Sequence, residues 1–370
     1  MSQGRFPTYA AEEELRERRR RGEPVVSLYG TPAPALPAHV VEAVAAALAG
    51  PQRTAPARGL TALRATLAAE LGGSTGRPVD SETELLVTNG AMQALGVCFR
   101  ALLEPGDEVI VPVPSFFFGG PIRAAGGTPV HVPSTPARRW RWNLDAVAAA
   151  IGPRSRALLL CNPGNPTGLV PPRADVEAIV RLAAEAGLLV VTDEAYEASL
   201  WGGAQLASAF AVWEEVILVR SLGKSLSLPT LRLGLLAGPA PLVARCAEVL
   251  EWDCLRVGGA AQHAAIAALA GDRSWLRGVH RSLEESLEVA AGAVRDAGIA
   301  FVRPDGGPFL FVGDGSELAL ARRLVDVGLP VVDGVHFQAP GFARLPFGGA
   351  SEARPELEQA LARFAALPAG

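Results

Sequence analysis

Short apolar runs separated by helix-like segments dominate the middle of the chain, from about residue 85 to about residue 240. The runs are rich in valine and leucine and lack the polar alternation of a strand with one wet face. They are DEVIVPV (107–113), GTPVHVP (127–133), RALLLC (156–161), LLVVTD (188–193) and VILVRS (216–221). Because strands buried on both faces have this composition, we predict an α/β fold with a mostly parallel central sheet covered by helices.

The segments between these runs carry a helical period. In ADVEAIVRLAAEAG (174–187), apolar residues recur at every third or fourth position, and the pattern stops at Gly187, a typical helix end. Another helix is predicted to begin within TNGAM (88–92), at Gly90 to Met92. Its predicted buried stripe consists of Met92, Leu95, Phe99 and Leu102. Helices that alternate with parallel strands form the crossover connections of such a sheet.

The two flanks of the chain differ from its middle. Residues 1–49 contain a charged helix, a proline-rich stretch and an alanine-rich helix, while 260–370 contain long helices and short strands such as PFLFVGD (308–314). We therefore predict a large α/β domain over 50–255. A smaller α+β domain is predicted from 1–49 together with 256–370.

Composition narrows the class of protein. The 370 residues are 49% hydrophobic and 19% charged with a net charge of −4, which is typical of a globular protein and does not favour a nucleic-acid partner. We expect no membrane span and no secretory signal, because no run of 18 apolar residues occurs and the first 30 residues lack an apolar core. The four cysteines form no CxxC pair, so we expect reduced thiols and a cytoplasmic protein without a metal site.

Lys224 is the only lysine in a chain with 34 basic residues. Arginine serves as the cation everywhere else, yet a guanidinium cannot lose its proton and attack a carbonyl carbon. Lys224 is therefore a candidate Schiff-base residue, and the alternative is an ordinary surface lysine.

Three polar or glycine-rich segments follow predicted strands, and a fourth precedes a predicted helix. They are TNGAM (88–92), NPGNPTG (162–168), DEAY (193–196) and SLGK (221–224). Ligands of open α/β sheets bind beyond the carboxyl ends of the strands, so these segments are expected to converge on one edge. A helix start such as Gly90–Ala91–Met92 suits a phosphate. A strand-end carboxylate such as Asp193 needs a cationic partner if it is buried; turns and helix caps are the alternatives.

Together, TNGAMQA, NPGNPTG, DEAY and SLGK…R resemble the class I/II aminotransferase family, the aspartate-aminotransferase-like fold type I enzymes that use pyridoxal 5′-phosphate. The order Asn165, Asp193, Tyr196, Lys224, Arg232 fits that family, and the resemblance extends from about residue 28 to about residue 345. It implies the fold type I transferase architecture and a homodimer with shared active sites.

The resemblance also implies roles for individual residues. Lys224 would form the Schiff base and carry the substrate α-proton, with Asp193 on the pyridinium nitrogen and Tyr196 on the ring oxygen. The residues implied to bind the cofactor are Gly90, Ala91, Met92, Phe116, Asn165, Asp193, Tyr196, Ser221, Lys224 and Arg232. Those implied to bind the substrate are Gly30, Asn165 and Arg344, the last as a fork on the α-carboxylate. Phe117 and Phe118 are alternatives to Phe116 as the ring-stacking residue.

One departure from the family concerns the partner subunit's contribution. Many relatives carry a tyrosine about five residues before the glycine of a G-x-x-x-L-R segment, where it reaches the phosphate of the neighbouring subunit. Thr54 stands at that place here, and either Thr54 or Arg53 is a candidate replacement. We hypothesise that Arg256 enters the neighbouring site and contacts phosphate or an acidic substrate group; a surface arginine is the alternative.

The predicted function is transfer of the amino group of an L-amino acid to a 2-oxo acid through Lys224. The alternative is another reaction on the same fold: a β-eliminating carbon–sulfur lyase, or a decarboxylating or oxidative deaminase of a biosynthetic pathway. A ligand-sensing domain is the non-catalytic alternative. The side chain of the substrate is not predicted.

Overall fold

The computed structural model describes residues 6–23, 25–26, 28, 34–51, 53–316, 319–329, 331–348 and 354–367. Its α-helices are α1 (Pro7–Arg20), α2 (Ala38–Ala49), α3 (Thr61–Thr75), α4 (Ala91–Leu102), α5 (Gly119–Ala124), α6 (Leu144–Ala150), α7 (Arg173–Glu185), α8 (Leu222–Ser225), α9 (Ala240–Cys254), α10 (Gly259–Ala270), α11 (Ser274–Asp296), α12 (Leu320–Asp326) and α13 (Arg354–Leu361). The strands are β1 (Leu85–Thr88), β2 (Glu108–Val113), β3 (Thr128–Pro133), β4 (Ser155–Cys161), β5 (Leu189–Asp193), β6 (Val216–Arg220), β7 (Gly234–Ala237), β8 (Phe301–Val302), β9 (Phe309–Gly313), β10 (Val332–Asp333) and β11 (Phe342–Pro346).

A seven-stranded sheet forms the centre of the larger part of the molecule, with strand order β1-β7-β6-β5-β4-β2-β3. Strands β2 to β6 pair in parallel, and β7 runs antiparallel to both of its neighbours. The predicted mostly parallel sheet is confirmed, and each of the five apolar runs forms a strand. The expectation that all five are buried on both faces is wrong for β3, which is the edge strand and is largely uncovered.

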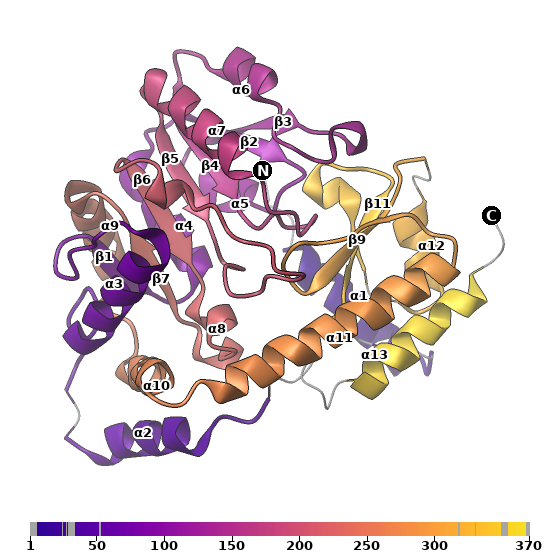
Figure 1. Ribbon diagram of the computed structural model, residues 1–370, viewed down its shortest axis with the longest axis horizontal. Helices are drawn as coiled ribbons and strands as arrows, with labels where there is room; N and C mark the ends of the chain where they lie inside the picture. Colours follow the sequence, from indigo (N-terminus) through magenta and orange to yellow (C-terminus); the bar gives the residue numbers. More distant parts are fainter. Residues whose placement is uncertain are drawn as a thin grey trace.

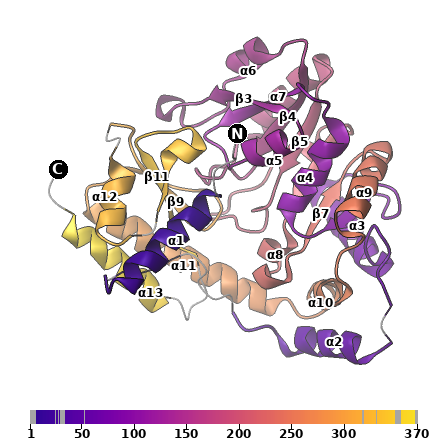
Figure 2. The ribbon, with the colours of Figure 1, turned by 180° about the vertical axis from the view of Figure 1, so that it is seen from behind.

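Helices cover both faces of this sheet. Helices α4 and α9 pack on one face, where they lie in front in the rear view, and α7 packs on the other (Figures 1 and 2). The predicted stripe of α4 is partly wrong, because Leu95 and Phe99 are buried while Met92 and Leu102 are only half-buried. The helices on both sides present apolar residues to the sheet, because a parallel sheet is buried on both faces.

A second, antiparallel sheet of order β10-β11-β9-β8 forms the smaller part of the molecule. Helices α11, α12 and α13 share its apolar core, and α11, 23 residues long, runs from the large part to this sheet (Figure 1). Among the described residues, no helix is both long enough and apolar enough to cross a membrane.

The division into a domain of residues 50–255 and a domain of residues 1–49 and 256–370 stays a prediction. Two helices outside 50–255 pack with the larger part of the molecule. Val40 of α2 and Ala264 of α10 belong to the same buried cluster as Leu63 and Val87 of the large part. Helices α2 and α10 pack against each other at the bottom of the molecule (Figure 1). Both helices thus add to the core of the seven-stranded sheet.

Candidate active site

A cavity of about 150 Å³ opens at the carboxyl ends of β4, β5 and β6, beside the start of α4. Parallel strands place their carboxyl ends at one edge, which is why loops distant in the sequence meet there. The residues that line it are Ala91, Met92, Phe116, Cys161, Asn165, Asp193, Ala195, Tyr196, Ser221, Gly223, Lys224, Pro229 and Arg232. Apart from Gly90, every residue proposed from the sequence as a cofactor ligand lies in this lining.

Gly90 lies directly against Arg232 at the end of the cavity where α4 begins. Its φ is +82°, and a Cβ at this position would lie 3.0 Å from Nη2 of Arg232. A side chain here would therefore strain the backbone and press on the guanidinium. The glycine leaves room for free backbone amides and a cation at the same helix start, an arrangement suited to an anion.

Lys224 lies on α8, a single turn of helix that follows strand β6 and residue Ser221. Its Nζ lies 3.8 Å from the centroid of the Tyr196 ring, and its side chain is exposed at the open side of the cavity. Lys224 thus lines one cavity with Asp193 and Tyr196, although it belongs to a different loop.

Asp193 ends strand β5 and is 7% exposed. Burial raises the pKa of its carboxyl group, while the positive charge of Lys224 and a hydrogen bond of 2.9 Å from the Ala195 amide to Oδ1 act in the opposite direction. A further cationic or N–H partner inside the cavity would stabilise the ionised form of this buried carboxylate.

Arg344, on β11, reaches across to the loop that contains Asn165. Its Nη1 donates a hydrogen bond of 3.0 Å to Oδ1 of Asn165, and its guanidinium carbon lies 5.3 Å from the Phe337 ring centroid. The side chain is 7% exposed, and its Nε is buried without a hydrogen-bond partner. A buried guanidinium with a free donor is prepared to accept a carboxylate.

Only Phe116 of the three consecutive phenylalanines lines the cavity. Phe118 is fully buried in the core, and Phe117 packs against Phe116 with ring centroids 4.7 Å apart and an angle of 31° between the ring planes. Of the three candidates, the structure brings Phe116 to the cavity.

A buried ionic network behind the cavity was not predicted from the sequence. Glu194 is fully buried and accepts hydrogen bonds from Nη2 of Arg220, at 3.0 Å, and from Oγ of Ser208, at 2.5 Å. Burial raises the pKa of the neighbouring Glu197 to about 7, and its Oε2 is buried without a hydrogen-bond partner. Asp193 and Tyr196 lie in the same short segment, so the network anchors the loop that supplies both.

Thr54 and Arg256, which the sequence singled out separately, are hydrogen-bonded to each other. Nη1 of Arg256 lies 3.0 Å from Oγ1 of Thr54 and 3.1 Å from the Ala55 carbonyl oxygen. Neither residue, nor Arg53, lines the cavity of this chain. Gly30 lies outside the described residues.

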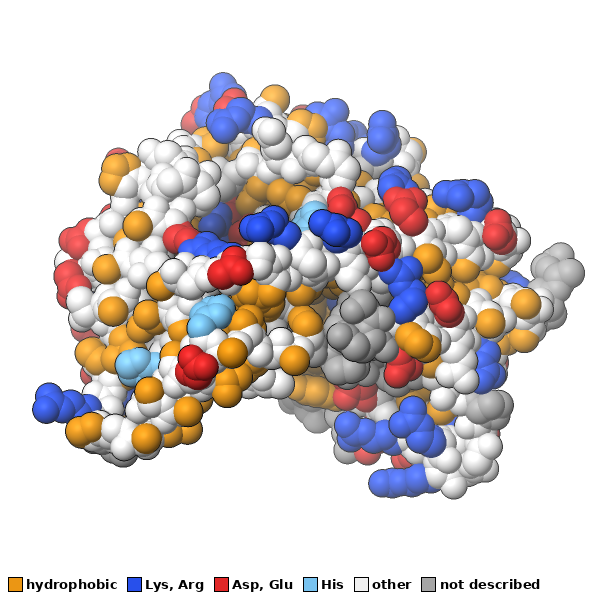
Figure 3. Space-filling model, turned by 60° about the horizontal axis from the view of Figure 1, so that its bottom comes forward, with side chains coloured by type: hydrophobic (Ala, Val, Ile, Leu, Met, Phe, Trp, Pro, Cys, Tyr) orange, Lys and Arg blue, Asp and Glu red, His pale blue; other side chains and the backbone are white. Residues whose placement is uncertain are grey.

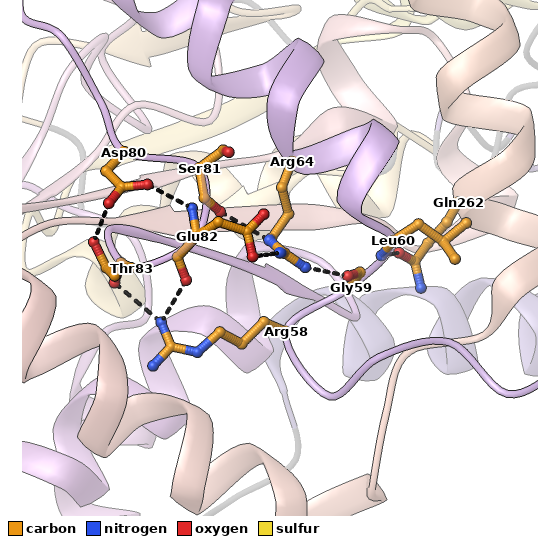
Figure 4. Close-up of polar contacts among 9 residues, drawn as sticks. All are labelled: Arg58, Gly59, Leu60, Arg64, Asp80, Ser81, Glu82, Thr83 and Gln262. Carbon is orange, nitrogen blue, oxygen red and sulfur yellow. Dashed lines mark hydrogen bonds and ion pairs between the residues drawn. The ribbon is translucent and has the colours of Figure 1, made fainter.

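The G-x-x-x-L-R segment is held in place by two buried polar side chains (Figure 4). Arg64 donates to the Gly59 and Ser81 carbonyl oxygens and to Glu82, while Oε1 of Gln262 accepts a hydrogen bond of 2.7 Å from the Leu60 amide. The bond from Leu60 to Gln262 connects this segment, which follows Thr54, to α10, which follows Arg256.

Sequence reasoning missed four residues of the cavity lining: Cys161, Ala195, Gly223 and Pro229. Cys161 ends β4 opposite Asp193, and burial raises the pKa of its thiol. Ala195 and Gly223 adjoin predicted site residues in the sequence, so adjacency was the available signal for them. Met92, which the sequence assigned both to the buried stripe of α4 and to the cofactor site, lies in this lining.

Comparisons with known proteins agree on one family. The chain matches the family model for aminotransferase class I and II over residues 28–364. It is 34% identical to the probable aspartate/prephenate aminotransferase of Thermus aquaticus, over 97% of this chain and 95% of that protein, and 31% identical to the aspartate aminotransferase of Streptomyces avermitilis, over 92% and 89%. The solved aspartate aminotransferase of Thermus thermophilus with maleate is similar at a TM-score of 0.91 and 32% identity, covering 99% of this chain and 97% of that one.

Proposed function

The chain belongs to the class I and II aminotransferase family, and from this premise we propose that it binds pyridoxal 5′-phosphate and moves the amino group of an L-amino acid to a 2-oxo acid. The family resemblance seen in the sequence motifs is confirmed, and the chain is an aminotransferase. Which cofactor it binds, and which residues bind it, belong to the proposal.

The residues of the cavity fit this cofactor in three respects. Asp193 is a buried carboxylate with a raised pKa, which a protonated ring nitrogen would compensate. Gly90 leaves open the space that its Cβ would fill beside Arg232, which suits a phosphate at the start of α4. Lys224 offers the one lysine amine of the chain to an aldehyde.

Each part of the cofactor would have its own partners. Gly90, Ala91, Met92, Ser221 and Arg232 would bind around the phosphate, and Phe116 would cover the ring. Asn165 and Tyr196 would hydrogen-bond the ring oxygen, and Asp193 the ring nitrogen. When bound, the group supplies an electron-accepting ring that makes the substrate α-proton acidic.

Two residues would act on the substrate directly. Arg344 would bind the α-carboxylate, which supplies an anion for its buried, unpartnered Nε. Lys224 would take the proton from the substrate α-carbon and deliver it to carbon C4′ of the cofactor. This role requires an amine that can be neutral. The observation that carries the proposal is the presence of this single lysine in one cavity with the buried Asp193.

A single turnover tests the proposal. Protein loaded with pyridoxal 5′-phosphate is mixed with a pool of L-amino acids, without any 2-oxo acid, and the released cofactor and products are analysed by mass spectrometry. Pyridoxamine 5′-phosphate and one equivalent of a 2-oxo acid are expected. Unchanged cofactor with accumulating ammonia, thiol or carbon dioxide would instead indicate a lyase or deaminase and overturn it.

We further propose a homodimer with shared active sites. Four large apolar side chains are exposed by 50% to 94% on α2 and at the end of α9: Val41, Leu48, Trp252 and Leu255. Hydrophobic side chains gather on the face that Figure 3 presents, which is the bottom of Figure 1, where α2 and α10 lie. An exposed apolar patch is typical of an interface, and a second copy is the occupant we propose.

In this dimer, Arg256 would serve the phosphate of the neighbouring site. It is bonded to Thr54, the residue that stands where many relatives have a phosphate-binding tyrosine, and it follows the exposed Leu255. A cation at that place would replace the tyrosine hydroxyl by a stronger phosphate ligand.

The four unpaired cysteines support a cytoplasmic location.

A further inference from the structure

Trp140 brings a ring from the large part of the molecule onto the four-stranded sheet. It lies in the loop between β3 and α6, and its ring centroid lies 5.1 Å from that of Phe342 and 5.8 Å from that of Phe311. Both contacts are edge-to-face, with 78° and 63° between the ring planes, an arrangement that aromatic pairs favour. Since Phe342 belongs to β11 and Phe311 to β9, the loop contacts both central strands of the smaller sheet.

The two phenylalanines that Trp140 contacts flank Arg344. Arg344 pairs with Phe311 across the register of β11 and β9, and Phe342 precedes it by two positions on β11. Cross-strand partners and residues two apart in a strand share one face of a sheet. The guanidinium and both rings therefore belong to the same face.

The guanidinium of Arg344 lies against a group of buried rings that we call the aromatic platform: Phe311, Phe337 and Phe342. Phe311 and Phe342 are stacked with centroids 4.9 Å apart, and Phe311 lies 6.2 Å from Phe337. The guanidinium carbon lies 5.3 Å from the Phe337 centroid, within the range of a cation–π contact. Trp140 thus connects to the guanidinium through the rings of the platform.

The backbone of the loop holds Trp140 in this position. Part of the tryptophan surface lines a cavity of about 330 Å³, and the side chain is half-buried. Arg139 and Trp140 have φ values of 52° and 58°, in the left-handed region that is unfavourable for residues with a Cβ. Hydrogen bonds fix this turn, from the Arg139 amide to the Pro136 carbonyl oxygen at 2.8 Å and from the Trp140 amide to that of Thr135 at 3.1 Å. Strain that the surrounding structure maintains is concentrated at functional positions in proteins.

We infer that Trp140 is a positioning residue for substrate binding: its ring holds the aromatic platform, which in turn holds the guanidinium of Arg344. This inference rests on the proposed function, because it takes Arg344 as the partner of the α-carboxylate. It requires that loss of the ring weakens different carboxylates by the same factor, since each of them presents the same group to Arg344.

Two unreactive compounds test this requirement: 3-phenylpropionate and succinate, which share one carboxylate for Arg344 and differ at the other end. Their dissociation constants are measured by calorimetry on the cofactor-loaded protein. Trp140→Ala should weaken both compounds by about fivefold, while cofactor affinity, measured by titration of the apoprotein, should stay within about twofold. Trp140→Phe keeps a ring and should bring both compounds back to within about twofold of the parent values.

A double-mutant cycle tests whether Trp140 acts through Arg344. Arg344→Gln should weaken both compounds by at least about tenfold, because the charged fork is lost. Adding Trp140→Ala to that variant should cause no further loss, since the ring no longer has a guanidinium to position.

Trp142→Ala is the matched control, because it removes the other tryptophan of the same loop, which is also half-buried but packs against the core of the seven-stranded sheet. It should leave both dissociation constants within about twofold of the parent values. If Trp140→Ala does not fold, Trp140→Leu, which keeps apolar bulk without a ring, is measured in its place.

Three results overturn the inference while leaving transamination intact: unchanged affinities without the ring, a loss confined to one compound, or losses that add in the double variant. An equal loss of cofactor affinity would also overturn it, because it would indicate a general structural role. If neither compound binds the parent protein and no amino acid converts the cofactor, the inference and the proposed function both fail.

Discussion

Nη1 of Arg344 donates a hydrogen bond of 3.0 Å to Oδ1 of Asn165, a residue 179 positions away in the chain. Asn165 follows β4 of the seven-stranded sheet, and Arg344 belongs to β11 of the four-stranded sheet. The bond fixes the guanidinium while its Nε stays buried without a partner. Both sheets therefore contribute to one anion position, and a carboxylate bound there would join them.

Lys224→Arg keeps the positive charge but removes the amine. We expect turnover to fall by at least about 10³-fold, because a guanidinium neither attacks the aldehyde nor accepts the α-proton. Borohydride reduction followed by mass spectrometry should show cofactor attached to the parent protein and none attached to the variant. A variant with turnover close to that of the parent would contradict the role of Lys224.

Asp193→Asn removes the buried carboxylate without changing its size. Without cofactor, we expect the free energy of unfolding to stay the same or rise by on the order of 1 kcal/mol, because burial disfavours this charge. With cofactor, turnover should fall by about 10²-fold or more, since the ring nitrogen loses its anionic partner. Thermal unfolding of the apoprotein and single-turnover rates measure the two effects, and a fall in apoprotein stability above 2 kcal/mol would argue against this account.

Gly90→Ala should weaken cofactor binding by about tenfold or more, because the new Cβ presses on Arg232 and the backbone is strained by about 1–3 kcal/mol. Gly96→Ala is the control within the same helix. Its Cβ would meet the Arg100 side chain at 3.7 Å, an ordinary contact, so a stability gain of up to about 1 kcal/mol is expected. Cofactor titration by fluorescence distinguishes the two, and equal affinity in both variants would refute the proposed phosphate position.

Glu197 makes stability depend on pH. Burial raises its pKa from 4.5 to about 7, so between these values the folded protein binds more protons than the unfolded chain does. The free energy of unfolding therefore falls as pH rises through this window, by about 3 kcal/mol at most. Denaturant unfolding between pH 4.5 and 7.5 should show this slope, and Glu197→Gln should flatten it. An unchanged slope in the variant would assign the effect to other groups.

Arg256→Ala should raise the dissociation constant of the cofactor by about tenfold, because a charge-assisted phosphate contact is lost. Adding Thr54→Tyr to that variant should restore part of the affinity by supplying a hydroxyl from the neighbouring chain. Both values come from equilibrium titration of apoprotein, with Arg245→Ala, which removes an exposed arginine of α9, as the control. If Arg256→Ala alters neither cofactor affinity nor substrate KM, Arg256 is an ordinary surface residue.

The sequence predicts what depends on local composition. Strands β2 to β6 were identified from apolar runs, because a strand covered on both sides needs apolar residues at every position. The exposure of β3 was not predictable from its composition, since it follows from the absence of a pairing strand beyond it. Strand β7 was also missed; it has four residues and an antiparallel direction that only its neighbours determine.

In the site, too, local motifs were predictable from the sequence and long-range contacts were not. Residues in ordered motifs, such as Asn165 and Lys224, were found because their spacing is distinctive. The network of Glu194 and Arg220 and the contacts of Phe117 with Phe6 and Phe337 were not found, since they join side chains from separate segments whose proximity arises only on folding. The bond between Thr54 and Arg256 joins two residues that the sequence singled out for separate reasons.

Helix α11 has a mechanical consequence for the site. Its 23 residues span about 34 Å as one hydrogen-bonded rod, from the neighbourhood of α10 to the four-stranded sheet that carries Arg344. A tilt of about 5° at its first turn displaces the far end by about 3 Å, roughly the length of one hydrogen bond. The helix thus acts as a lever arm: a rotation too small to break any backbone contact within it can still decide whether Arg344 reaches a carboxylate.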